Sequence, residues 1–260
     1  MRIAYVGIDL LYSGLEALWD NNCEILKIFT CQTNNITEFN VKIVEFALSN
    51  KIPYTMERIT INDILWLKKM GCELIVCGGY YYKIPVDESI PMINIHPTLL
   101  PLGRGSWPMP LIILRRDRKS GVTFHKISEG FDEGDIVLQK EFDISPNENH
   151  ETYMKKSGEL IYEMIRELLK NFELLYSNAK PQGPGEYLKE PGKEIYTLNE
   201  NMSFEEADLI LRAFYGYECY YEKKGKIYEL IKGKVVRGKK EGENLNVKGG
   251  YIKCSIINEM

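Results

Sequence analysis

The sequence contains no long apolar run and no strong excess of charge of either sign. No stretch approaches the roughly 20 apolar residues that a transmembrane helix needs, and Asp9 interrupts the apolar N-terminal run too early for a signal peptide. The formal net charge of -4 argues against general nucleic-acid binding, although a local basic patch is compatible with it. We therefore expect a cytoplasmic protein with neither a membrane nor a nucleic acid as its partner.

Paired cysteines and a glycine-rich nucleotide loop are also missing. The six cysteines are scattered without any Cys-x-x-Cys pair, which argues against a disulfide framework or a zinc knuckle and favours reduced, buried thiols. The first apolar run ends in the single Gly7, whereas a dinucleotide-binding loop follows a Gly-x-Gly-x-x-Gly pattern. A dinucleotide cofactor is therefore disfavoured.

Strand and helix signals alternate through the first two thirds of the chain. Short apolar runs predict strands over residues 3–8, 24–30, 73–77 and 92–96. Helical spacing predicts helices between them, over residues 10–19, 41–48 and 61–70, and in the last of these it places Ile61, Ile64 and Leu65 on one apolar face. This alternation predicts an α/β fold with a Rossmann-like, mostly parallel sheet that helices cover on both faces.

The pattern changes after residue 120. Residues 122–126 and 136–141 are predicted to form two strands joined by a turn-rich connection. Residues 149–175 then show the spacing of one face of a long amphipathic helix.

Prolines and glycines crowd residues 181–192, which suggests a domain boundary. We predict an N-terminal domain over residues 1–180, a linker over residues 181–192 and a small β-rich C-terminal domain over residues 193–260. In the last of these, the sequence from Ser203 to Glu206 is a capping-box pattern that predicts the start of a helix.

The candidate functional residues gather between residues 94 and 139. Asn94 and His96 lie two apart, which on a strand directs both side chains to one face, and Pro97 then ends the strand. Asp132 lies in an Asp-Glu-Gly-Asp turn that could equally be a plain hairpin connection. A metal site built from His96 and these acids is conceivable, but one histidine gives no ligand spacing.

Four motifs in this region, taken in order, carry a family resemblance. They are NIHPTLLP at residues 94–101, Arg-Gly at 104–105, GVTFH at 121–125 and DEGD at 132–135. Together they resemble the folate-dependent formyltransferases, and the resemblance covers about residues 1–175. It implies formyl transfer from 10-formyltetrahydrofolate, a co-substrate, to a primary amine, and it requires no metal.

The resemblance also implies roles for particular residues. Asn94, His96 and Asp132 match the catalytic residues of the family. The folate-contacting positions correspond to two loops, and they are Tyr81, Tyr82, Lys83, Ile84, Ser128 and Gly130. The tyrosine-rich loop departs from the commoner aliphatic versions, and a mixed packing surface is its alternative interpretation.

The expected chemistry suits these residue types. The Asn94 amide and the His96 imidazole can donate hydrogen bonds to the formyl oxygen as negative charge develops on it. His96 and Asp132 can carry a proton from the attacking amine towards the departing folate nitrogen.

Three amines compete as the acceptor. A glycinamide ribonucleotide enzyme would usually be shorter, and a methionyl-tRNA formyltransferase would usually be longer, with a basic C-terminal domain. Lysines do occur in the tail, including Lys239 and Lys240, but glutamates dilute them. Residues 202–214 are similar to the tail of the nucleotide-sugar N-formyltransferases.

We therefore expect a homodimeric enzyme that formylates a UDP- or dTDP-linked 4-amino or 3-amino dideoxy sugar used in polysaccharide biosynthesis. Methionyl-tRNA is the alternative acceptor. A folate-dependent hydrolase and a binding module that retains the fold are the interpretations outside the transferase class.

Overall fold

The computed structural model describes residues 1–238 and 245–259, and the chain forms two compact units. The first unit comprises Met1–Gly105, Ser120–Phe142 and Met154–Tyr187. The second comprises Ser106–Lys119, Asp143–Tyr153 and Leu188–Met260, so it includes two segments from within the predicted N-terminal domain. Lys239 and Lys240, two of the lysines of the tail, lie outside the described residues.

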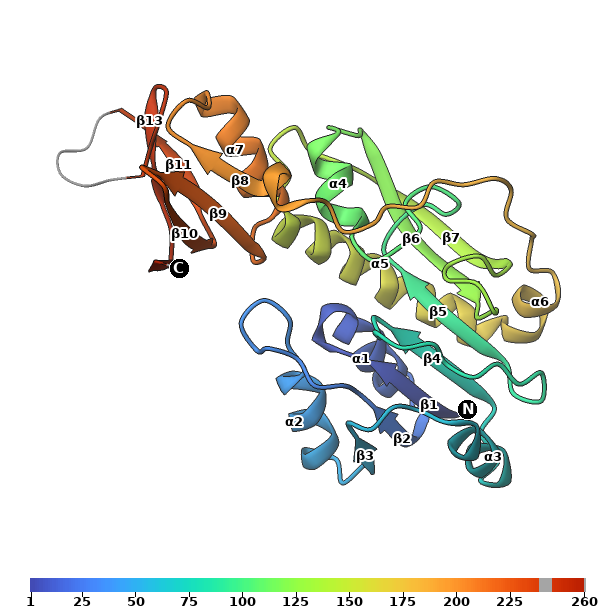
Figure 1. Ribbon diagram of the computed structural model, residues 1–260. Helices are drawn as coiled ribbons and strands as arrows, with labels where there is room; N and C mark the ends of the chain where they lie inside the picture. Colours follow the sequence, from blue (N-terminus) through green and yellow to red (C-terminus); the bar gives the residue numbers. More distant parts are fainter. Residues whose placement is uncertain (239–244, 260) are drawn as a thin grey trace. The chain divides into compact units, whose positions relative to one another are not determined.

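A seven-stranded sheet is the centre of the first unit (Figure 1). In sheet order its strands are β3 Tyr54–Thr55, β2 Glu24–Phe29, β1 Arg2–Gly7, β4 Leu74–Gly78, β5 Met92–His96, β6 Lys119–Lys126 and β7 Ile136–Asp143. The pairs from β3 through β5 are parallel, whereas β6 runs antiparallel to β5. The predicted α/β fold with a mostly parallel sheet is therefore confirmed.

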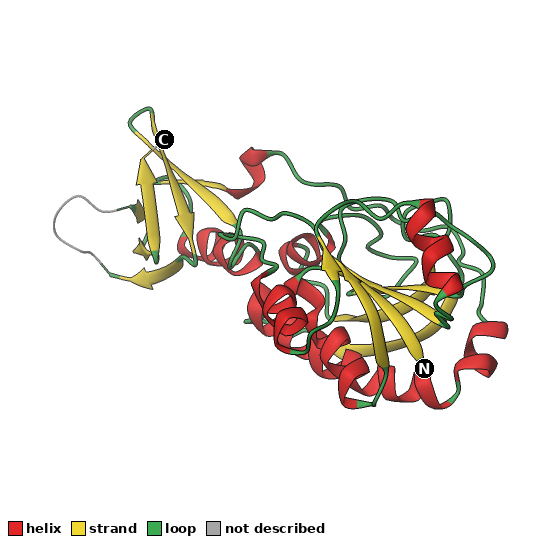
Figure 2. Cartoon of the chain, turned by 90° about the horizontal axis from the view of Figure 1, so that it is seen from below, coloured by secondary structure: helices red, strands yellow, loops and turns green. Residues whose placement is uncertain are grey.

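Helices cover both faces of this sheet, as Figure 2 shows. They are α1 Tyr12–Asp20, preceded by the 3-10 turn η1 Asp9–Leu11, then α2 Val41–Ser49, α3 Ile61–Lys69, α5 His150–Lys170 and α6 Phe172–Ser177. Leu15 of α1, Ile43 of α2 and Ile165 of α5 pack in one core cluster with alternate strand residues. Ile64 of α3 packs in a second cluster with the intervening strand residues. Two buried faces explain why the strands are apolar throughout.

Two helix predictions need correction. The expected single helix over residues 149–175 is divided at Asn171, whose Nδ2 lies 3.3 Å from the Glu167 carbonyl oxygen. Asparagine competes with the helical backbone in this way, which favours a helix end. In α3, Ile64 is buried but Leu65 is 51% exposed, so the apolar spacing assigned too wide a face to the core.

The second unit combines two small sheets with short helices. One sheet has the order β14-β10-β9-β8, formed by Ile256–Glu259, Lys226–Ile231, Glu218–Lys223 and Thr197–Asn199. The other has the order β11-β13-β12, formed by Lys234–Arg237, Gly250–Lys253 and Asn246–Val247. The helices are α4 Pro108–Leu114, η2 Lys193–Tyr196 and α7 Phe204–Ala213.

The capping box predicted for α7 is present. The Ser203 side chain accepts from the Glu206 N–H, and the Glu206 carboxylate accepts from the Ser203 N–H. Helix α4 was not predicted, because its short run of apolar residues between prolines lacks a helical period. None of the described helices combines the length and the apolar character required to cross a membrane.

Candidate active site

Strand β5 carries the first two candidate residues at its carboxyl end. Asn94 and His96 lie on β5 between the parallel β4 and the antiparallel β6. The register pairs Asn94 with His125 on β6, so the two side chains are cross-strand neighbours. His125 was not among the predicted site residues, although the GVTFH motif that contains it could have indicated a role in the site.

Asp132 reaches this strand pair from the β6–β7 connection. Its Oδ1 lies 3.4 Å from His96 Nδ1 and 3.3 Å from Asn94 Nδ2. The same oxygen lies 3.6 Å from His125 Nε2, while Oδ2 accepts the Gly105 N–H at 2.9 Å. The structure therefore brings Asn94, His96 and Asp132 together, with His125 as a fourth member; we call these four residues the polar cluster.

The backbone of Asp132 adopts a left-handed conformation with φ of 56°. This region is uncommon for residues other than glycine, and aspartate tolerates it better than most. The conformation turns the chain back towards β5 and directs the carboxylate to the two imidazoles.

Backbone contacts assign the hydrogen positions of both rings. His125 Nδ1 lies 2.8 Å from the Lys126 carbonyl oxygen, so it carries the hydrogen, and Nε2 accepts from Asn94 Nδ2 at 3.0 Å. His96 Nε2 lies 2.7 Å from the Gly103 carbonyl oxygen and is likewise a donor. In its neutral form His96 therefore directs the lone pair of Nδ1 towards Asp132.

The amide of Asn94 differs from the sequence-based expectation in one respect. Its Nδ2 already donates to His125 Nε2 at 3.0 Å and contacts Asp132 Oδ1 at 3.3 Å. Both amide hydrogens thus have partners, and the contact with Asp132 is the longer. A substrate oxygen at this point would have to replace Asp132 as the acceptor of one N–H.

Burial and charge set the protonation of the cluster. Burial lowers the pKa of His96, and the Asp132 carboxylate and the Gly103 carbonyl oppose this shift. For Asp132, burial would raise the pKa, but His96, His125 and the Gly105 N–H bring it well below its usual range. The cluster at neutral pH thus contains an ionised carboxylate beside a neutral, proton-accepting imidazole.

The side chains of Gln139 and Thr123 hold the turn that follows β5. Gln139 Nε2 donates to the Leu100 carbonyl at 2.8 Å and to Thr123 Oγ1 at 2.7 Å. Thr123 Oγ1 donates to the Thr98 carbonyl at 2.7 Å. This network fixes the turn that presents the Gly103 carbonyl to His96.

The six predicted folate-contacting residues lie on two loops that touch each other. Lys83 Nζ donates to the Glu129 carbonyl at 2.8 Å, which joins the loop after β4 to the loop before Asp132. Ser128 Oγ donates to the Gly130 carbonyl at 3.2 Å within the second loop. Tyr81 and Tyr82 are each 42% exposed, whereas Ile84 is buried.

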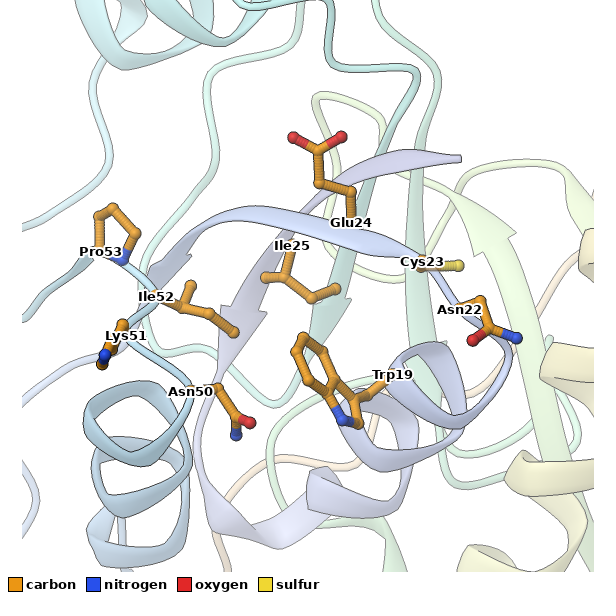
Figure 3. Close-up of a pocket in the computed structure, with 9 residues that line it drawn as sticks. All are labelled: Trp19, Asn22, Cys23, Glu24, Ile25, Asn50, Lys51, Ile52 and Pro53. Atoms are coloured by element: carbon orange, nitrogen blue, oxygen red, sulfur yellow. The ribbon is translucent and has the colours of Figure 1, made fainter.

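An open hollow of about 560 Å³ lies elsewhere in the first unit (Figure 3). Its lining comes from the ends of α1 and α2 and the start of β2: Trp19, Asn22, Cys23, Glu24, Ile25, Asn50, Lys51, Ile52 and Pro53. The polar cluster contributes no residue to it, because parallel strands place the start of β2 and the end of β5 at opposite edges of the sheet.

Comparison with known families identifies the segment around the polar cluster. Residues 43–169 match the family model described as formyl transferase. Over these residues the chain is similar to the formyl transferases, and we call residues 43–169 the formyl transferase segment. The formyl transferase segment contains Asn94, His96, His125 and Asp132, together with both predicted folate loops.

Individual relatives extend the comparison. The methionyl-tRNA formyltransferase of Ehrlichia ruminantium is 36% identical over 167 residues, which cover 63% of this chain and 54% of the relative. The chain thus matches about half the length of this curated relative.

Solved structures agree on the fold. HypX from Aquifex aeolicus in complex with tetrahydrofolic acid superposes with a TM-score of 0.76 at 19% identity, over 100% of this chain and 44% of that chain. A sugar N-formyltransferase from Shewanella gives a TM-score of 0.67 at 19% identity, over 89% of this chain and 96% of that one. At this identity the likeness supports the fold alone.

Proposed function

We propose that this protein transfers a formyl group from 10-formyltetrahydrofolate to a primary amine. One observation carries the proposal. At the end of β5, inside the formyl transferase segment, the Asp132 carboxylate lies 3.3 Å from the Asn94 amide and 3.4 Å from the His96 imidazole. Sheets of this kind bind ligands at the carboxyl ends of their strands, which is where the cluster lies.

The two loops beside the cluster fit a folate. Tyr81 and Tyr82 are partly exposed, and the hydrogen bond from Lys83 to the Glu129 carbonyl joins their loop to the loop that leads to Asp132. We assign Tyr81 to Ile84, with Ser128 and Gly130, to folate binding. When bound, 10-formyltetrahydrofolate supplies an activated formyl group for transfer.

His96 is the proton acceptor in this proposal. Its Nε2 is held by the Gly103 carbonyl, and the neutral Nδ1 can take the proton that the attacking amine must lose. The resulting imidazolium lies 3.4 Å from the Asp132 carboxylate, which stabilises it. The protonated Nδ1 can then return the proton to the departing nitrogen, a general acid–base role that is commonly worth about 10²–10⁴ in rate.

Asn94 is the hydrogen-bond donor to the formyl oxygen. Its longer contact, 3.3 Å to Asp132 Oδ1, is the one that the formyl oxygen replaces. The shorter contact to His125 keeps the amide oriented during this exchange. A donor of this kind typically stabilises the transition state by about 2.7–4 kcal/mol.

Among the possible acceptors we place methionyl-tRNA first. The relative from Ehrlichia ruminantium, at 36% identity, carries that name and supports this choice. The order reverses the expectation from the sequence, which favoured the amino sugar on the resemblance of residues 202–214.

A nucleotide-linked amino sugar is the second candidate. The net charge of -4 favours it, because tRNA binding depends on many cationic contacts with phosphates. The likeness to the fold of the Shewanella sugar N-formyltransferase is consistent with this substrate.

A single set of assays separates these functions. The purified protein receives 10-formyltetrahydrofolate together with methionyl-tRNA, with UDP- and dTDP-linked amino sugars, with glycinamide ribonucleotide, or with no amine. Formyl-methionyl-tRNA as the main product supports the first acceptor, and a formylated sugar supports the second. Formate release without any amine identifies a hydrolase, and no turnover under any condition contradicts the enzymatic proposal.

A further inference from the structure

Gln182 lies at the start of the predicted linker, yet its side chain is fully engaged in the first unit. Its Nε2 donates to the Asp132 carbonyl at 2.9 Å and to the Gly134 carbonyl at 2.7 Å. Its Oε1 accepts from Arg104 Nε at 3.1 Å and from Arg104 Nη2 at 2.8 Å. Both amide hydrogens and both oxygen lone pairs therefore have partners.

The first pair of contacts holds the backbone that follows the Cα of Asp132, at the carbonyls of Asp132 and Gly134. Asp132 has a φ of 56°, a conformation that persists only where surrounding contacts hold the backbone. Hydrogen bonds to these two carbonyls provide such contacts. Gly134 packs tightly on β6, where an added Cβ would meet the Lys126 carbonyl oxygen at 1.8 Å. Gln182 thus completes the support of the turn from a separate segment of the chain.

The second pair of contacts reaches the turn that orients His96. Arg104 follows Gly103, whose carbonyl accepts from His96, and precedes Gly105, whose N–H donates to Asp132. Gln182 therefore joins the turn that orients the imidazole to the turn that carries the carboxylate.

The segment that carries Gln182 is itself anchored. The Arg104 N–H donates to the Glu186 carbonyl at 3.0 Å, and the Glu186 N–H donates to the Pro101 carbonyl at 3.1 Å. Arg104 Nη2 also donates to the Gly183 carbonyl at 3.1 Å. The side chain of Gln182 consequently extends from backbone that hydrogen bonds hold in place.

We propose that Gln182 is a positioning residue that fixes the Asp132 carboxylate against His96 by holding the Asp132 and Gly134 carbonyls. The inference rests on the proposed formyl transfer for its effect on rate, but the effect on His96 is independent of any substrate.

Two variants separate this role from simple attachment of the segment. Gln182→Met keeps the length of the side chain and removes every hydrogen bond. Gln182→Glu retains the contact with Arg104 but cannot donate to the two carbonyls. A purely structural tie to Arg104 would survive in the second variant, whereas positioning of Asp132 would not.

The readouts are the ring titration of His96 by NMR, and kcat and KM. In Gln182→Met the carboxylate is less well held, so its support of the imidazolium weakens and the His96 titration moves to lower pH. We expect kcat to fall on the order of 100-fold in both variants, since misplacement by about 1 Å can cost that much, with KM for the amine nearly unchanged. Gln32→Met, the same change at an exposed position, is the control and should match the unaltered protein.

The outcomes are distinct from those of the functional proposal. If the unaltered protein has no transferase activity, the proposed function fails, and the His96 titration still tests Gln182. An unshifted titration in a folded Gln182→Met protein overturns the inference. Should that variant not fold, Gln182→Glu decides, and an unaltered kcat there overturns the inference equally.

Discussion

Two buried histidines, one in each unit, differ in the polar groups that surround their rings. His96 is 5% exposed and His150 is 8% exposed, and burial lowers the pKa of both. His96 has the Gly103 carbonyl and the Asp132 carboxylate within 3.4 Å. His150 Nε2, by contrast, has no hydrogen-bond partner among the described residues.

The surroundings of His150 are aromatic. Its ring meets Tyr217 edge-on with centroids 4.7 Å apart, and Tyr217 in turn lies 4.9 Å from Trp107. Tyr196 stacks on Phe214 at 4.7 Å in the same group. We call these residues, with His150, the aromatic cluster.

The comparison separates two uses of a neutral imidazole. In the polar cluster the Asp132 carboxylate can stabilise the protonated His96 ring, so protonation can be part of a reaction. In the aromatic cluster nothing described offsets the charge, so protonation can only oppose folding. Changes in the polar cluster should therefore alter rate, and changes in the aromatic cluster should alter stability.

The largest effect is expected from His96→Ala. Loss of the proton acceptor should lower kcat for formyl transfer on the order of 10³-fold. Binding of the folate should survive, because its predicted contacts lie on other loops. Rate measurements together with folate titration test this, and full activity in the variant would remove His96 from the mechanism.

Asp132→Asn should have the next largest effect. The amide keeps the shape of the side chain but no longer stabilises the imidazolium, and we expect about 100-fold lower kcat. The titration of His96 should move to lower pH, because the carboxylate is what opposes the effect of burial. A variant with wild-type rate and an unchanged His96 titration would break the distinction between the two clusters.

The pH dependence of stability should expose His150. Burial lowers its pKa to about 4 in the folded protein, whereas the unfolded chain has a value near 6.5. Between these values the unfolded state binds the proton and the folded state does not, so stability falls as the pH falls. From about pH 6.5 to about pH 5 the contribution changes by about 1.5 kcal/mol.

Urea unfolding of the unaltered protein and of His150→Leu at these two pH values measures this contribution. The variant should lose less stability on acidification than the unaltered protein by that amount. Equal losses in both proteins would show that His150 is not the group responsible.

The smallest effect is expected from the helix caps. Ser203→Ala removes the α7 cap and should destabilise the second unit by about 1 kcal/mol without changing kcat. Thr60→Ala removes the matching capping box of α3 in the first unit and is its control. Thermal unfolding measures both, and a fall in kcat for Ser203→Ala would show that the second unit contributes to the rate.

Local patterns were sufficient to predict much of the first unit. The strand at residues 92–96 appears with the predicted bounds, because apolar residues followed by proline define it without reference to the rest of the chain. The α7 cap was similarly readable. Helix α4, the break at Asn171 and the two-residue β3 were missed, because their signals are short and depend on what packs against them.

For the candidate site, the residue types and the shared face of Asn94 and His96 were determined by the sequence alone, because side chains two apart on a strand point the same way. The tertiary structure decided the rest. It placed His125 against the Asn94 amide, turned Asp132 into a left-handed conformation and brought Gln182 from 50 residues away to hold it. Such contacts depend on the order of the strands in the sheet and on where the chain reverses. The local sequence pattern around one residue does not specify which distant segment will pack against it.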